Sequence, residues 1–245
     1  MAGDRTLFVH VGDHKTGSSF LQSCFAASVG ALAEAGIRYP EPRHIERVAA
    51  GGGSFGNAGV LMPVATGKPK KNEDIVGPTE AQPHVLYSGE TLFVSLVRGR
   101  TLPALIAAAR AAGFERLEIL LFIRDPGGDI HAIDDGARAF SRPQMAARFI
   151  AACAEHPEVR LTVRNYSVVR RDLRGTVAAW LGLPVETLTP PPVATVNRSL
   201  TRLLRFRPAA AAHRFPIIVS EACQHGPTKE AIHAFGQHIS LIQQP

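Results

Sequence analysis

Residues 6–22, near the start of the chain, read TLFVHVGDHKTGSSFLQ. The segment 6–12 is mostly apolar, β-branched or aromatic and ends at a glycine, which is typical of a buried strand. From residue 19 to 34 the apolar side chains recur at helical spacing, and Gly36 closes the predicted helix. The stretch therefore predicts a strand, a short turn and a helix.

The same alternation continues along the chain. Further strands are predicted at 84–88, 117–123 and 159–164, and further helices at 102–112, 143–155, 168–181 and 228–242. This order predicts a three-layer α/β domain with a mainly parallel sheet. We interpret residues 1–245 as one domain, with a Gly- and Pro-rich loop or lid insertion at 51–83 and a C-terminal helical extension at 201–245.

The turn between the first strand and the first helix has the composition of an anion cradle. Lys15 carries a positive charge, Gly17 lets the backbone bend, and Thr16, Ser18 and Ser19 offer hydroxyl groups. The N–H groups of the following helix add a partial positive charge. The order differs from the ATP or GTP loop G-x-x-x-x-G-K-[ST], because Lys15 precedes Gly17. The alternative interpretation is a capped helix with a lysine nearby.

The turn also resembles a known family. HKTGSSFLQ, residues 14–22, is similar to the 5′-phosphosulfate loop of bacterial sulfotransferases that use 3′-phosphoadenosine 5′-phosphosulfate (PAPS). Other segments resemble later parts of that family in the same order: YSGE (87–90), FIRDP (122–126), VRNY (163–166) and VNRSL (196–200). The resemblance implies a P-loop nucleotide-hydrolase-like fold of the sulfotransferase type. It also implies transfer of a sulfuryl group from PAPS to a hydroxyl or amine of a carbohydrate or small metabolite.

The resemblance assigns residues to the cosubstrate. The 5′-phosphosulfate would be held by the loop residues Lys15, Thr16, Gly17, Ser18, Ser19 and Phe20. Arg124 would contact the 3′-phosphate, Tyr166 would approach the adenine, and Arg198 would complete the site. The chain departs from the family at Ala132, where a serine usually gives a second 3′-phosphate ligand.

Catalysis in this scheme needs a base and a positive charge near the leaving group. Lys15 is the candidate for stabilising that charge, and Glu90 is the candidate base, with His14 as its rival. The scheme predicts no metal, and the chain has no HExxH-type cluster. The remaining histidines, including His10, are interpreted as structural.

Composition and charge restrict the partners. The chain has 245 residues, 45% hydrophobic and 20% charged, with a net charge of +6. Ten arginines lie between residues 160 and 214, against Asp172 and Glu186. This excess suits a polyanionic ligand or a solvated face. Few aromatic residues interleave with it, so we expect no nucleic-acid partner. No apolar run reaches the length of a membrane span, and the N-terminus lacks signal-peptide features, so we predict a cytoplasmic protein.

Two other functions stay open at this point. The first is a P-loop-like kinase or nucleotide hydrolase, for which Asp125 is the only nearby magnesium ligand. The second is a binding protein that retains the sulfotransferase fold without catalysis, as Ala132 and the acidic segment 129–135 suggest.

Overall fold

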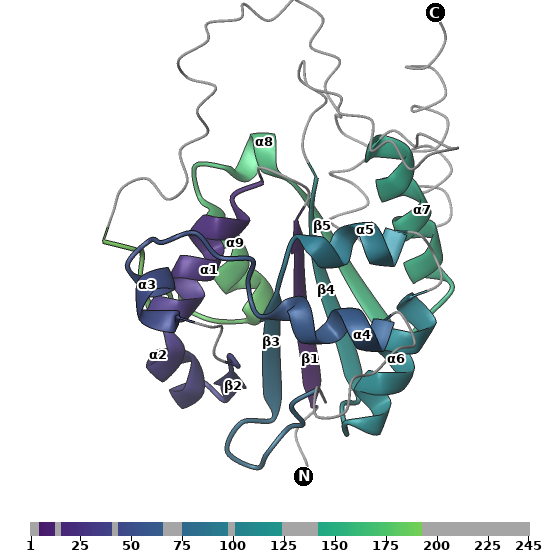
Figure 1. The fold of residues 1–245 in the computed structure, drawn as a ribbon, viewed down its shortest axis with the longest axis horizontal. Coiled ribbons are helices and arrows are strands. Elements are labelled where there is room, and N and C mark those ends of the chain that lie inside the picture. The colour runs from purple at the N-terminus through teal and green to yellow at the C-terminus, as the bar shows by residue number, and fades with distance from the viewer. Residues whose placement is uncertain are drawn as a thin grey trace, which may run out of the picture.

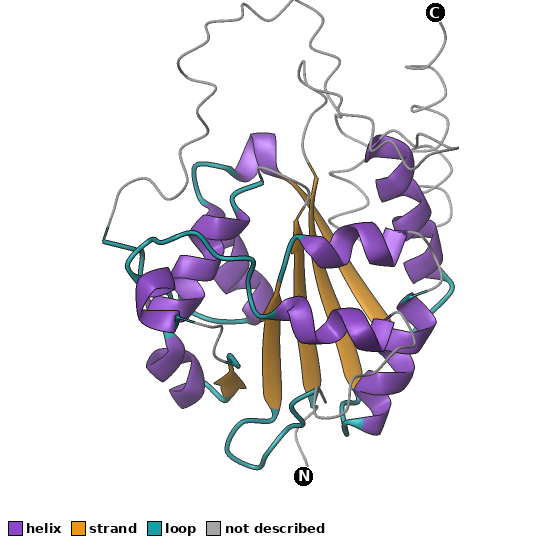
Figure 2. Cartoon of the chain, viewed as in Figure 1, coloured by secondary structure: helices purple, strands orange, loops and turns teal. Residues whose placement is uncertain are grey.

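Five parallel strands form one sheet in the order β2-β3-β1-β4-β5 (Figures 1 and 2). The computed structural model describes residues 5–12, 16–40, 44–65, 75–97, 101–123 and 142–192. The strands are β1 (Thr6–Gly12), β2 (Ile37–Arg38), β3 (His84–Ser88), β4 (Arg116–Ile123) and β5 (Val159–Asn165). The first strand is central, because Val9 pairs with Tyr87 of β3 on one side and with Ile119 of β4 on the other.

Helices cover both faces of this sheet, which confirms the predicted three-layer α/β domain (Figure 1). One face carries α4 (Leu61–Ala65), α5 (Thr91–Val97), α6 (Leu102–Ala111) and α7 (Arg142–Ala154). The other carries α1 (Ser18–Ala27), α2 (Val29–Glu34) and α9 (Leu173–Leu181), with α3 (Ile45–Ala49) packed beside α1. Three shorter elements complete the described part: η1 (Ala58–Val60), α8 (Tyr166–Val169) and η2 (Val185–Thr187).

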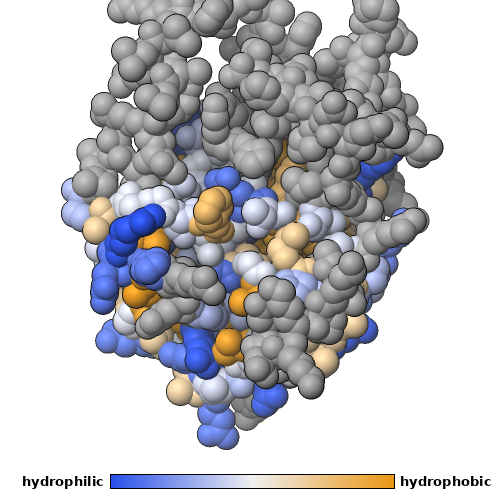
Figure 3. Space-filling view, in the orientation of Figure 1, coloured by the Kyte–Doolittle hydropathy of each residue, from blue (hydrophilic) through white to orange (hydrophobic). Residues whose placement is uncertain are grey.

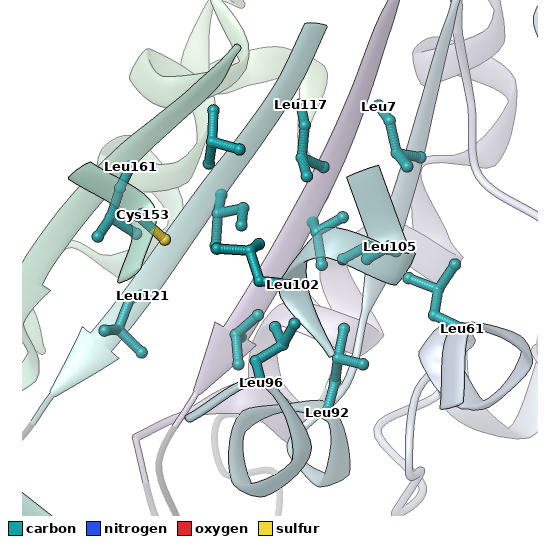
Figure 4. Close-up of a cluster of buried hydrophobic side chains, with 14 of the residues drawn as sticks. Leu7, Leu61, Leu92, Leu96, Leu102, Leu105, Leu117, Leu121, Cys153 and Leu161 are labelled. Carbon is teal, nitrogen blue, oxygen red and sulfur yellow. The ribbon is translucent and has the colours of Figure 1, made fainter. Parts of the chain in front are cut away.

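Each face of the sheet has its own hydrophobic core. Successive side chains of a strand point to opposite faces, so Leu7, Val9 and Val11 of β1 pack toward α4–α7 while Phe8 packs toward α1 and α9. Figure 4 shows the first core, in which leucines from the strands meet leucines from α4, α5 and α6. The cysteines of the described chain, Cys24 and Cys153, are buried and free, and burial raises the pKa of both thiols to about 12.

Two predicted helices are divided in the structure. The helix expected at 19–34 breaks at Ser28, whose φ is −113°, and the Ser28 hydroxyl accepts a hydrogen bond from the N–H of Thr189 at 2.7 Å. The helix expected at 168–181 becomes α8 and α9, because Asp172 caps α9 by accepting from the N–H of Gly175 at 3.0 Å. The Asp172 bond is a local cap that competes with a continuous helix, whereas the Ser28 bond joins the first break to a segment distant in sequence.

Other elements differ from the prediction or lie outside the described residues. The short strand β2 and the helix α5 have no counterpart in the sequence prediction. The loop or lid expected at 51–83 contains η1 and α4. The predicted helix 228–242 and the extension 201–245 lie outside the described residues.

The surface of the described part carries no extended apolar area in the view of Figure 3, where apolar side chains form small separate areas among polar ones. Within the ranges that the structure describes, no helix has the length and apolar character needed to cross a membrane.

Candidate functional site

The ends of the strands form the most informative edge of the sheet. The helix that follows β1 lies on one face, and the helices that follow its neighbours β3 and β4 lie on the other. Connections that leave on opposite faces open a crevice beyond the strand ends, which is where ligands of parallel α/β sheets bind. The predicted anion cradle lies at this edge, because it joins the central strand to α1.

Gly17 shapes the turn into α1. Its φ and ψ are 79° and 11°, in the left-handed region, and it occupies the N-cap position without a side-chain cap. Its carbonyl accepts the first helical hydrogen bond, from the N–H of Leu21 at 3.1 Å. A glycine reaches this backbone conformation without steric strain. An α-helix directs the N–H groups of its first turn out of its N-terminus, so the turn presents donors toward the crevice.

Gly12, the last residue of β1, keeps two hydroxyl groups close to the strand. A Cβ atom at this position would lie 2.6 Å from Oγ1 of Thr16 and would also collide with Oγ of Ser18. Thr16 and Ser18 are 0% and 1% exposed. The Ser18 hydroxyl has no hydrogen-bond partner among the described residues, which is unusual for a buried polar atom. A side chain at position 12 would therefore occupy the space between the end of β1 and the hydroxyl groups of the turn.

Tyr166 lies against the same turn. A Cβ atom on Gly17 would lie 3.1 Å from Cε2 of Tyr166 and 2.6 Å from Cδ1 of Leu173. The tyrosine begins α8, which Asn165 caps by accepting from the N–H of Ser167 at 2.9 Å. The half-buried aromatic ring thus forms one wall beside the glycine.

Beneath the turn lies His10, which the sequence analysis treated as structural. It is fully buried, and its Nδ1 lies 2.8 Å from Oγ of Ser88 on β3. Its ring packs edge-on against Phe122 and Phe25, with centroid distances of 5.5 and 6.4 Å. Burial lowers its pKa to about 3, so the ring is neutral near neutral pH. No motif marks it; the only sequence signal is a polar residue inside an otherwise apolar central strand.

The residues after β3 reach the same edge. Gly89 donates its N–H to the carbonyl of His10 at 3.1 Å. Asn57 fixes the neighbouring loop, since its side chain accepts from the N–H of Ser88 at 2.7 Å and donates to the carbonyl of Leu86 at 3.1 Å. Glu90, the predicted base, follows this junction directly and precedes α5. Glu90 therefore lies at the same edge of the sheet as the β1–α1 turn, two residues beyond the end of β3.

The remaining predicted site residues divide into two groups. Ser19 uses its carbonyl within α1, accepting from Oγ of Ser23 at 2.9 Å, and Phe20 packs against the core beside α1. His14, Lys15, Arg124 and Arg198 lie outside the described residues, as does Ala132. The arrangement that can be described is a glycine turn with buried hydroxyls, an aromatic wall and a carboxylate nearby. It suits a ligand that carries an anionic group and a flat ring.

A metal site is not formed by these residues alone. The described ranges contain no group of three His, Cys, Asp or Glu side chains arranged to hold an ion. The carboxylates closest in sequence to the ends of β1 and β4, Asp13 and Asp125, lie outside those ranges.

Fold and turn together define an α/β protein with a glycine turn between the central strand of a parallel sheet and its helix. The comparison with protein families adds one finding: residues 144–245 match the model of the GNT-I family. This match covers fewer than half of the 245 residues, from α7 to the C-terminus. The family is one of glycosyltransferases of the N-acetylglucosaminyltransferase I type, which use UDP-sugar donors and usually a divalent metal.

The match corrects the functional part of the sequence analysis. The prediction of a PAPS-dependent sulfotransferase is wrong, and so are PAPS as cosubstrate and the expectation that no metal is required. The kinase or hydrolase and the non-catalytic sulfotransferase-fold protein fit the match no better. The physical reason is the limited content of the motif. A turn of Thr, Gly and Ser before a helix indicates that an anion binds there. It does not indicate to which molecule the anion belongs.

Proposed function

We propose that this protein is a glycosyltransferase that holds the diphosphate of a nucleotide-sugar donor at the β1–α1 turn. The observation that carries the proposal is the buried Ser18 hydroxyl, which has no partner among the described residues and lies beside Gly12 at the end of the central strand. The GNT-I match supports the glycosyl donor, because that family uses UDP-sugars.

The turn would bind the diphosphate through neutral donors. The N–H groups at the start of α1 and the hydroxyls of Thr16 and Ser18 surround the point where Gly12 lacks a side chain. Lys15 precedes this turn and would add a full positive charge. Donors held in place before the reaction stabilise the charge that develops on a departing diphosphate. This is the predicted role of Lys15, transferred to a different leaving group.

Tyr166 would orient the nucleotide. Its ring stands beside Gly17, in the turn that would hold the diphosphate. An aromatic ring in this position offers a stacking surface to a base such as uracil. Tyr166 also lies within the segment that matches the GNT-I family.

Transfer would occur at the anomeric carbon of the sugar. The acceptor, a hydroxyl group of a carbohydrate or small metabolite, forms a new C–O bond as the bond between the anomeric carbon and the β-phosphate oxygen breaks. The acceptor proton passes to a carboxylate, for which Glu90 is the candidate at this edge, with His14 as its rival. The electron pair of the broken bond leaves with the nucleoside diphosphate.

Calorimetric titration tests the proposal directly. We expect UDP and UDP-N-acetylglucosamine to bind the full chain, and Ser18→Ala to weaken both by about tenfold or more, because a hydrogen bond to a charged group is lost. Ser23→Ala is the matched control, since Ser23 is a buried serine on the same helix whose hydroxyl is used within it. We expect its affinity to match that of the wild type.

Three results would contradict the proposal: no binding of UDP at millimolar concentration, equal effects of the two serine variants, or a clear preference for adenosine 3′,5′-bisphosphate over UDP. If UDP-N-acetylglucosamine binds as expected, release of UDP in the presence of a panel of glycan acceptors would identify the transfer step.

A further inference from the structure

His10 is the most unusual buried residue of the described chain. It is fully buried in the central strand, one ring nitrogen meets the Ser88 hydroxyl at 2.8 Å, and the other, Nε2, has no partner among the described residues. Two phenylalanines, Phe25 and Phe122, pack edge-on against the ring. A phenylalanine would fill the same space without buried nitrogen atoms, so packing alone does not account for an imidazole at this position.

Nε2 of His10 lies near the hydroxyl groups of the β1–α1 turn. A Cβ atom built on Gly12 would lie 3.7 Å from Nε2 of His10, 2.6 Å from Oγ1 of Thr16 and in collision with Oγ of Ser18. The three polar atoms therefore surround the side-chain position that Gly12 leaves open. Both Nε2 and the Ser18 hydroxyl are buried and lack partners within the described ranges. Both atoms thus lie within 4 Å of one position, and a direct hydrogen bond between them requires the turn to move toward β1.

We propose that His10 is a positioning residue for the β1–α1 turn, whose Nε2–H donates to the Ser18 hydroxyl and turns the hydroxyl proton outward toward an anionic ligand. This inference rests on the proposed function, because it assigns the orientation of the same hydroxyl. Ser88 fixes the ring: its hydroxyl donates to Nδ1 and leaves the imidazole proton on Nε2.

The protonation state of the ring suits this role. Burial lowers the pKa of His10 to about 3, so the ring is neutral near neutral pH and carries one proton, on either Nδ1 or Nε2. The partner of one nitrogen then decides which nitrogen carries that proton. The neutral, buried Nε2–H group of His10 adds no charge to the anion cradle. The positive charge that balances the anionic ligand would come from Lys15.

Three variants separate positioning from packing. In His10→Phe the ring volume remains and both nitrogens are lost; in His10→Gln the amide nitrogen replaces the Nε2 donor. His84→Phe is the matched control, because His84 lies on the same sheet at the opposite end and also packs edge-on against a phenylalanine, Phe8. Its Nδ1 accepts from the N–H of Thr6 at 3.3 Å, far from the turn along the strand.

Two readouts are measured on the full chain: amide hydrogen exchange of residues 16–20 without ligand, and the affinity for UDP. For His10→Phe we expect exchange at the turn at least threefold faster and affinity about tenfold weaker than in the wild type. His10→Gln should recover most of both losses. His84→Phe should change neither the exchange of 16–20 nor the affinity.

The outcomes distinguish this inference from the proposed function. If exchange at residues 16–20 is unchanged in His10→Phe, the positioning role is wrong, whatever UDP does. If exchange rises while the wild type itself binds no UDP, the positioning of the turn stands and the proposed function fails. If the glutamine variant is as defective as the phenylalanine variant in both readouts, donation from Nε2 is overturned.

Discussion

The two faces of the sheet are built from the same strands and differ in how they treat polar atoms. On the face covered by α4–α7 the core is mainly aliphatic, with many leucines (Figure 4). The buried Tyr87 hydroxyl on this face accepts a hydrogen bond from the N–H of Val76 at 3.1 Å. On the face covered by α1, α2 and α9, buried polar side-chain atoms lack partners within the described ranges. They belong to His10, Ser18, Gln22, Tyr39 and Trp180.

The difference in unpaired polar atoms indicates that one face of the sheet serves stability and the other serves function. An unpaired buried polar atom lowers stability, so a face free of such atoms is optimised for packing. Three of the residues with unpaired atoms, His10, Ser18 and Gln22, lie on β1 or the first turns of α1. The face that follows the glycine turn thus retains polar groups that packing alone does not explain. The predictions below test this division, beginning with the largest expected effect.

Leu121→Ala should produce the largest loss of stability. Leu121 is fully buried in β4 on the aliphatic face, and truncating such a side chain costs about 3 kcal/mol in the free energy of unfolding. Urea unfolding measures the loss. Ser18→Ala on the other face should change the unfolding free energy by only about 1 kcal/mol, because at most one neutral hydrogen bond is lost. Equal destabilisation by the two variants would contradict the division between the faces.

Gly12→Ala should remove ligand binding with a smaller effect on stability. The added methyl group would collide with Ser18 and approach Thr16 at 2.6 Å, so it closes the inner wall of the turn. We expect UDP affinity to fall by about a hundredfold, equivalent to roughly 2.7 kcal/mol. Gly30→Ala on α2 is the control, since nothing lies within 4 Å of its added Cβ. A control variant that loses affinity to the same extent would show that the effect is not local to the turn.

The sequence predicted the layers of the fold because local patterns determine them. The segment 6–12 and the apolar segment 117–123 form neighbouring strands at the centre of the sheet, and their side chains alone indicate buried strands. The breaks at Ser28 and Asp172 were missed in different ways. Ser28 bonds to Thr189, 161 positions away, which no local pattern records. Asp172 caps locally, but the apolar spacing across it outweighed that signal.

The site was predicted in part for the same reason. Gly17 and Ser18 are recognisable from their order in the turn, and Tyr166 came only from a family resemblance whose functional conclusion is wrong. His10 was dismissed because its role depends on Ser88 in a strand 78 positions away. Residues that act through partners distant in sequence carry no spacing that a single chain reveals.

His10 also makes stability depend on pH. Burial lowers its pKa from 6.5 to about 3, so the unfolded chain binds a proton at this site more readily than the folded chain does. The contribution is fully present above the unfolded value and is lost as pH falls from 6.5 toward 3. Between pH 7 and pH 5 we expect the free energy of unfolding to fall by about 2 kcal/mol more in the wild type than in His10→Phe. Parallel urea midpoints for the two proteins over this range would show that His10 does not carry the dependence.

Gln22→Leu should give the smallest effect, and in the opposite direction. Gln22 is fully buried on α1, and neither atom of its amide has a partner in the described part of the chain. Leucine has a similar volume and a strong helix propensity, so removing the amide should raise the free energy of unfolding by about 1 kcal/mol. Gln82→Leu, at a partly exposed position before β3, controls for the change in composition and should stay within about 0.5 kcal/mol of the wild type. A loss of stability in Gln22→Leu would mean that the amide is paired in solution. The unpaired atoms near the glycine turn would then be those of Ser18 and of the His10 ring, and the contrast between the two faces would be weaker by one residue.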